Sequence, residues 1–175
     1  MSYRVRNFSI IFLILLVAVV IQFSLFVKIP YMKFSPNLLL IITAFLGYAG
    51  GKNTGMLTGF FAGLIIDVFY CPVIGYNALV FLTIGLICGL LNRMFYADNL
   101  FAPILILMLC DLGNELLYFF VWHVLQAKFD FGYTLIHIIL PEMSLTFIAG
   151  LLLFKPLTFL AGKMYSHLET DDQEL

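Results

Sequence analysis

Residues 55–67 read Gly-Met-Leu-Thr-Gly-Phe-Phe-Ala-Gly-Leu-Ile-Ile-Asp. Glycines recur every fourth position, at Gly55, Gly59 and Gly63, and Asp67 continues the same spacing. Residues four apart lie on one face of an α-helix, so the stretch predicts a helix with a glycine stripe that ends on a carboxylate. Apart from Thr58, the residues between the glycines are apolar. A helix that is apolar on all sides is buried in protein or in a membrane.

The composition of the whole chain favours the membrane. Of 175 residues, 63% are hydrophobic and 11% are charged, whereas soluble domains have about 45–50% apolar and about 25% charged residues. A soluble protein of this length would have too little interior for so many apolar side chains. The net charge of −1 argues against a nucleic-acid partner. We therefore expect membrane lipid, and not nucleic acid, around this chain.

Six apolar stretches are candidates for membrane crossings, since a crossing needs about 20 apolar residues. They cover residues 8–27, 37–50, 55–70, 75–91, 100–125 and 133–154. The second and third are short and could instead form a re-entrant hairpin. That alternative would place Lys52 near the bilayer centre, at a cost of about 2.5–3.5 kcal/mol, so two full crossings are favoured.

The distribution of basic residues orients the six helices. With both termini in the cytoplasm, six of the nine Lys and Arg residues lie in inner segments and three in outer ones. Basic residues are enriched on the cytoplasmic side. The sequence thus predicts an all-α integral membrane protein with six transmembrane helices in one compact bundle. Residues 1–165 form this single polytopic domain, and 166–175 form an acidic cytoplasmic tail.

The glycine stripes have two interpretations. Gly85 and Gly89 repeat the four-residue spacing in the next helix. Small residues let membrane helices approach closely, because contact packing drives their association. The five glycines at 55, 59, 63, 85 and 89 therefore serve either packing within the bundle or a groove for the helix of a partner.

Asp67 lies near the outer end of its helix, where an ionised carboxylate is costly unless it faces protein or a water-filled cavity. It is followed by a short turn that contains Gly75 and Asn77. One interpretation is a functional acid in a cavity. The other is an acid that reaches the interface or the backbone amides of this turn. Asn77 could either cap the following helix or bind Asp67.

A second polar group, which we call the acidic cluster, consists of Asp111, Asn114, Glu115 and Glu142. The first three share one face of the fifth predicted helix, and Glu142 follows Pro141 near the middle of the sixth. The predicted spans hold four acids and no Lys or Arg, so an unpaired cluster should be protonated near neutral pH. The alternatives are a structural network, an internal His123 or His137, a metal or cationic ligand, or a base from another subunit.

The chain shows no set of residues for catalysis. Leu-Gly-Asn-Glu at 112–115 is superficially similar to the Gly-Asn motif of lipoprotein signal peptidases, but the second Asp-bearing motif of that family has no counterpart near 141–150. Nucleophile triads, HExxH and phosphate-binding loops are also missing. The three cysteines have no metal-ligand spacing. We expect no enzymatic activity, no cofactor and no metal.

From Ser35 to Arg93 the chain resembles the rod shape-determining protein MreD family. The matching signals, in order, are Pro36-Asn37-Leu-Leu-Leu, the polar turn at 51–55, the stretch from Gly59 to Asp67, Gly75-Tyr76-Asn77-Ala78-Leu79, and Asn92-Arg93 after a glycine-rich helix. Of the family signature, six positions carry over: Pro36, Gly59, Gly63, Asp67, Gly75 and Asn77. The acidic cluster lies outside this stretch, so its importance rests on the cost of burying carboxylates in a membrane.

The resemblance implies a non-enzymatic scaffold of the bacterial cell-elongation machinery, in the inner (cytoplasmic) membrane, that organises peptidoglycan synthesis. Its implied partners are the bitopic protein MreC and, through it, MreB filaments, RodA and the transpeptidase partner of RodA. The family is also thought to share a fold with substrate-binding components of energy-coupling-factor transporters. The alternative function is a small-molecule-binding membrane component of an uptake transporter, in which the acids line an outward-facing pocket.

Overall fold

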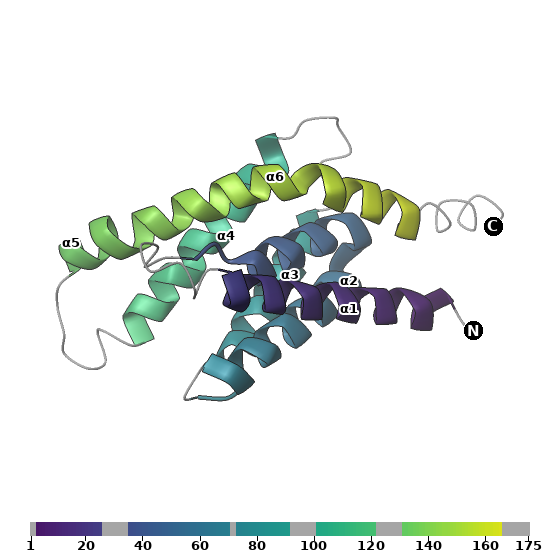
Figure 1. Cartoon of the computed structure of the whole chain (residues 1–175), viewed down its shortest axis with the longest axis horizontal. Coiled ribbons are helices and arrows are strands. Elements are labelled where there is room, and N and C mark those ends of the chain that lie inside the picture. The colour runs from purple at the N-terminus through teal and green to yellow at the C-terminus, as the bar shows by residue number, and fades with distance from the viewer. Residues whose placement is uncertain (1–2, 26–34, 71–72, 92–100, 122–130, 166–175) are drawn as a thin grey trace.

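The computed structural model describes residues 3–25, 35–70, 73–91, 101–121 and 131–165, and all regular structure in these ranges is helical (Figure 1). The predicted all-α class is confirmed. The elements are α1 (Tyr3–Leu25), α2 (Leu38–Tyr70), α3 (Tyr76–Leu91), α4 (Phe101–Phe119), α5 (Phe131–Thr134), the π-helix η3 (Leu135–Ile139) and α6 (Leu140–Tyr165). The start of α1 and the end of α6 lie at the same end of the molecule (Figure 1).

Helix α2 is a hairpin of two arms, 38–50 and 52–70. Gly51 between them has φ 77° and ψ −177°, a conformation with positive φ that glycine adopts without a steric cost. A Cβ added to Gly55 would lie 2.8 Å from the Cα of Gly47, although eight residues of a continuous helix span about 12 Å. The chain therefore reverses at Gly51, and the two arms correspond to the helices predicted at 37–50 and 55–70.

The last two predicted helices have different bounds in the structure. Helix α4 begins at Phe101, one residue after the predicted start, and the predicted end at 125 lies outside the described part of the chain. Helical structure continues from Phe131 of α5 through η3 to Tyr165, so it starts close to the predicted limit of 133 but ends well beyond the predicted limit of 154. The predicted end at 154 was placed where the apolar stretch ends, but the backbone of α6 stays helical beyond that point. The π-helix η3 ends two residues before Pro141. Proline has no backbone N–H, so it cannot donate the hydrogen bond that an α-helix has at this position.

The first arm of α2 lies at the centre of the bundle. It is surrounded on all sides, with Leu39 and Leu40 fully buried and Ile41 2% exposed. Helix α2 contacts α1, α3, α4 and α6. The same core contains Leu15 of α1, Ala62 of the second arm, Phe81 of α3, Leu107 of α4 and Leu157 of α6.

The outer surface is apolar. Large side chains such as Val20 of α1, Leu79 of α3 and Leu152 of α6 are 64%, 65% and 73% exposed. Soluble monomers rarely expose extensive apolar surface, so these faces fit a lipid environment. In the described part of the chain, one helix is long and apolar enough to cross a membrane, Leu135–Leu153, and two shorter apolar helices are Ile10–Gln22 and Tyr76–Leu91. The count of six crossings stays a prediction.

Candidate functional site

The glycine stripes of α2 and α3 face each other. A Cβ on Gly59 would meet the carbonyl oxygen of Phe81, and one on Gly55 would meet that of Gly85. A Cβ on Gly89 would lie 2.5 Å from the Cα of Lys52. Gly63 likewise abuts the backbone of Asn77. The two helices thus pack backbone against backbone, which leaves no space for another helix along the stripe.

Asp67 holds the start of α3. Its side chain is 1% exposed and accepts four hydrogen bonds. The backbone N–H groups of Gly75 and Ala78 donate to Oδ2 at 2.9 and 3.0 Å, and the backbone and side-chain amides of Asn77 donate to Oδ1, both at 3.0 Å. A carboxylate at a helix N-terminus also interacts favourably with the helix dipole. Of the two interpretations of Asp67, the geometry matches the acid that binds the backbone amides of the next turn.

The start of α2 is fixed by polar side chains from two distant helices. Asn37 caps α2, because its Oδ1 accepts the N–H of Leu40 at 3.2 Å. The N–H of Leu38 donates to Gln22 Oε1 of α1 at 3.1 Å, and the N–H of Asn37 donates to Thr146 Oγ1 of α6 at 3.2 Å. Pro36, before the cap, is buried.

Sequence reasoning did not single out Gln22 or Thr146. The available signal was a polar side chain inside an apolar helix, which has to find a partner where water is scarce. Hydropathy alone could not show that the Gln22 and Thr146 side chains would both bind backbone N–H groups at the start of α2. Together they tie α1 and α6 to the N-terminus of the central helix.

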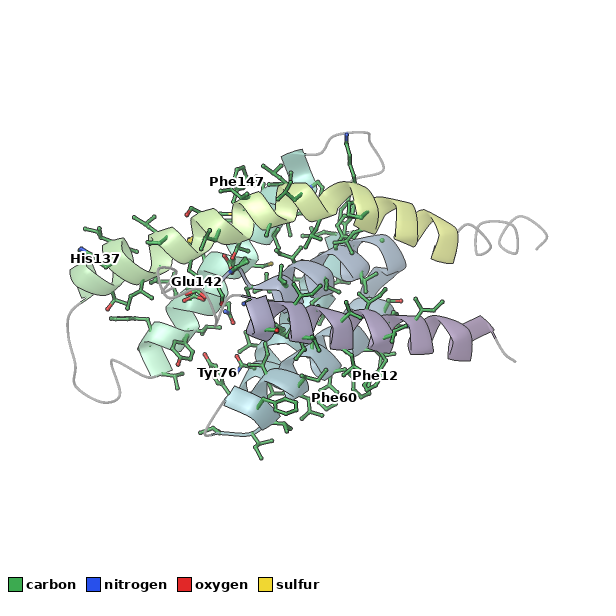
Figure 2. All side chains as sticks on the ribbon, in the orientation of Figure 1. Phe12, Phe60, Tyr76, His137, Glu142 and Phe147 are labelled. Carbon is green, nitrogen blue, oxygen red and sulfur yellow. The ribbon has the colours of Figure 1, made fainter. Side chains whose placement is uncertain are left out.

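The structure brings the acidic cluster together between α4 and α6. Asp111 is fully buried, and neither of its carboxylate oxygens has a hydrogen-bond partner within the described part of the chain. Glu142 of α6 lies within electrostatic range of Glu115 and Asp111 of α4, and Figure 2 shows Glu142 on the side of its helix that faces α4. Asn114 Nδ2 donates to Glu115 Oε1 at 3.5 Å.

The neighbours of the cluster restrict what it can bind. Thr146 lies beside the Asp111 carboxylate, while His137 is exposed and lies apart from Glu142 in Figure 2. His123 lies outside the described residues. Among the residues described, no group of three or more His, Cys, Asp or Glu side chains has an arrangement that could hold a metal ion. Three carboxyl groups close together repel one another when ionised, so the cluster favours a proton or a cation.

An apolar groove of about 460 Å³ lies next to the cluster, between α3 and α4. Its walls include Leu79, Thr83 and Ile87 of α3 and Cys110, Gly113 and Asn114 of α4. A Cβ on Gly113 would meet nothing within 4 Å. Asn114 therefore belongs to both features, because it lines the groove and donates to Glu115.

The fold and this site define an all-helical membrane protein whose close-packed helices enclose a group of carboxylates. The chain belongs to the MreD family, since the model described as rod shape-determining protein MreD matches residues 2–168, nearly the whole chain. It is accordingly a membrane protein of the machinery that determines rod shape. No curated protein and no solved structure matches the chain significantly. The family match covers α4 and α6, and thus includes the acidic cluster.

Proposed function

We propose that this protein is a non-enzymatic scaffold of the rod-shape machinery, in the inner membrane of a bacterium, that organises peptidoglycan synthesis through MreC-type partners. The observation that carries the proposal is the family match over residues 2–168. The outward apolar faces are compatible with it, because they fit the lipid environment in which such a scaffold would lie. MreB, RodA and its transpeptidase partner would then be reached through MreC.

The first test is capture of partners by the full chain. A tagged copy that replaces the native protein is purified in mild detergent from cells, and the proteins that accompany it are identified. We expect an MreC-type bitopic protein in the complex, and rounded cells when the protein is depleted. Rod-shaped depleted cells, together with purified protein that brings no such partner, would contradict the scaffold.

The proposed topology has six crossings and both termini in the cytoplasm. In a chain without native cysteines, Asn53→Cys in the exposed Gly51 turn should react with a membrane-impermeant thiol reagent only from the cytoplasmic side. Ile74→Cys, in the turn before α3 and 72% exposed, should react only from outside. Labelling of both positions from the same side would overturn this topology.

The second candidate function is binding of a small molecule, as in an uptake transporter. The groove between α3 and α4, about 460 Å³ in volume, favours it, since ligand pockets occupy about 300–1,000 Å³. Saturable binding of a vitamin or cation by purified protein, lost in Asp111→Asn or Glu115→Gln or when Gly113→Leu fills the groove, would support uptake. Binding of MreC-type partners without any such ligand would favour the scaffold.

A further inference from the structure

The feature that the packing of the bundle does not explain is Asp111. Its side chain is 0% exposed, and both carboxylate oxygens lack a close hydrogen-bond partner within the described ranges, although Thr146 lies beside them. Asp67, buried to the same extent, accepts four hydrogen bonds. Buried polar groups are nearly always partnered, so the unsatisfied oxygens of Asp111 point to a ligand that the isolated chain lacks.

The groups around Asp111 specify the charge of that ligand. Glu115 and Glu142 are within electrostatic range, and both side chains are half-buried, so the cluster extends from a fully buried carboxylate to two that are partly accessible. An unpaired carboxylate in a membrane is costly, and the cost falls when an opposite charge pairs with it. The described ranges hold no metal-binding arrangement of these side chains. A proton would remove the charge but would leave most of the carboxylate oxygens without donors, whereas an organic cation that donates several hydrogen bonds supplies both the opposite charge and the donors.

We propose that the acidic cluster receives one ammonium or guanidinium group, from a lysine or arginine in a membrane-spanning helix of a partner. This inference rests on the proposed scaffold function and names the chemistry of its contact. A basic residue inside the helix of the partner carries the same burial cost as Asp111, so pairing relieves both. A guanidinium or ammonium group supplies up to five or three donors, respectively, for the carboxylate oxygens.

The groove between α3 and α4 gives such a helix a place to pack. It is apolar, and Gly113 on its wall has open space beside it. Asn114 connects the groove to the cluster, because its amide donates to Glu115. A helix in this groove would therefore bring its side chains beside Asn114 and next to Glu115, the accessible edge of the cluster. The glycine stripes of α2 and α3 offer no comparable space, because they pack against each other.

The test uses the full chain in phosphatidylcholine vesicles with synthetic Leu-Ala helices of about 23 residues. One peptide has a central Lys, a second has Leu at that position, and a third has its Lys at one end. Binding is measured by energy transfer from the single tryptophan, Trp122, to a fluorophore on the peptide. We expect the central-Lys peptide to bind about tenfold more tightly than the other two. Equal binding of the three peptides would overturn the proposal.

Two variants locate the interaction. In Asp111→Asn/Glu115→Gln/Glu142→Gln the preference for central Lys should disappear, and in Ser144→Ala, an exposed position on α6, it should remain. A second measurement needs no variant: dicyclohexylcarbodiimide adds to protonated carboxyl groups in apolar surroundings, and the central-Lys peptide should block this labelling of the wild-type chain. Undiminished labelling, or a preference that survives the triple substitution, would refute the site.

Failure of this inference is distinguishable from failure of the scaffold. If the wild-type chain and the Asp111→Asn/Glu115→Gln variant capture the MreC-type partner from cells equally well, the scaffold stands and charge recognition is wrong. If the wild-type chain captures no such partner, the scaffold itself fails. Weakened capture by the acidic-cluster variant alone supports both.

Discussion

Asp67→Asn is expected to lower the free energy of unfolding by about 3–5 kcal/mol, because buried donors that lose their acceptor cost about 1–3 kcal/mol each. An asparagine has one oxygen and one NH₂ group. If the NH₂ group replaces Oδ2, the N–H groups of Gly75 and Ala78 lose their acceptor. If it replaces Oδ1, both donors of Asn77 lose theirs. The loss of charge at the N-terminus of α3 adds to the effect.

Asp111→Asn is the matched control, with the same chemical change at an equally buried aspartate. Thr146 lies beside Asp111, but no donor in the described structure makes a close hydrogen bond to it, so its neutralisation should change stability by less than about 1 kcal/mol or increase it. The measurement is thermal unfolding in detergent, followed by circular dichroism, for both variants and the wild-type chain. Equal losses at the two positions would show that Asp67 has no special role at the start of α3.

Gly59→Ala/Gly85→Ala is expected to destabilise the bundle by about 3 kcal/mol or more, since overpacking costs about 1–3 kcal/mol per site. The added Cβ of residue 59 would meet the carbonyl oxygen of Phe81, and that of residue 85 would meet the carbonyl oxygen of Gly55. Backbone atoms cannot rotate away as a side chain does, so α3 and the second arm of α2 would have to separate.

Gly113→Ala separates this steric effect from helix propensity. Gly113 lies inside α4, and a Cβ there would meet nothing within 4 Å. Alanine favours a helix by about 0.8–1 kcal/mol over glycine, so this variant should be slightly more stable than the wild-type chain. Unfolding by increasing denaturant in the same detergent compares the two. A double variant as stable as Gly113→Ala would disprove close packing of the stripes.

The sequence was most informative about the glycines, whose regular spacing in a membrane helix has one main structural consequence. Four-residue glycine spacing in apolar surroundings predicted close helix packing, and α2 and α3 have it. The pattern left open which helix would lie against the stripe, because any surface with small residues satisfies it. In the same way, Asp67 next to a turn had two interpretations. The distances to Gly75, Asn77 and Ala78 distinguish them.

The sequence indicated the acidic cluster only in part, and it did not indicate the hydrogen bonds at the start of α2. The placement of Asp111, Asn114 and Glu115 on one helix face followed from their spacing. Their proximity to Glu142 was only an inference from the order of the helices, and the structure puts Glu142 within electrostatic range of Asp111. That Thr146 and Gln22 fix the start of α2 could not be predicted, because the bonds join residues 109 and 16 positions apart.

The sequence by itself determined that the chain is helical and belongs in a membrane, because composition and apolar length are local properties of the chain. It also determined where backbones can approach closely, since glycine alone lacks a side chain. Only the tertiary structure decided that Asp67 accepts four hydrogen bonds and that Asp111 accepts no close one in the described structure. The two carboxylates have the same chemistry, and the donors that distinguish them come from the arrangement of the helices.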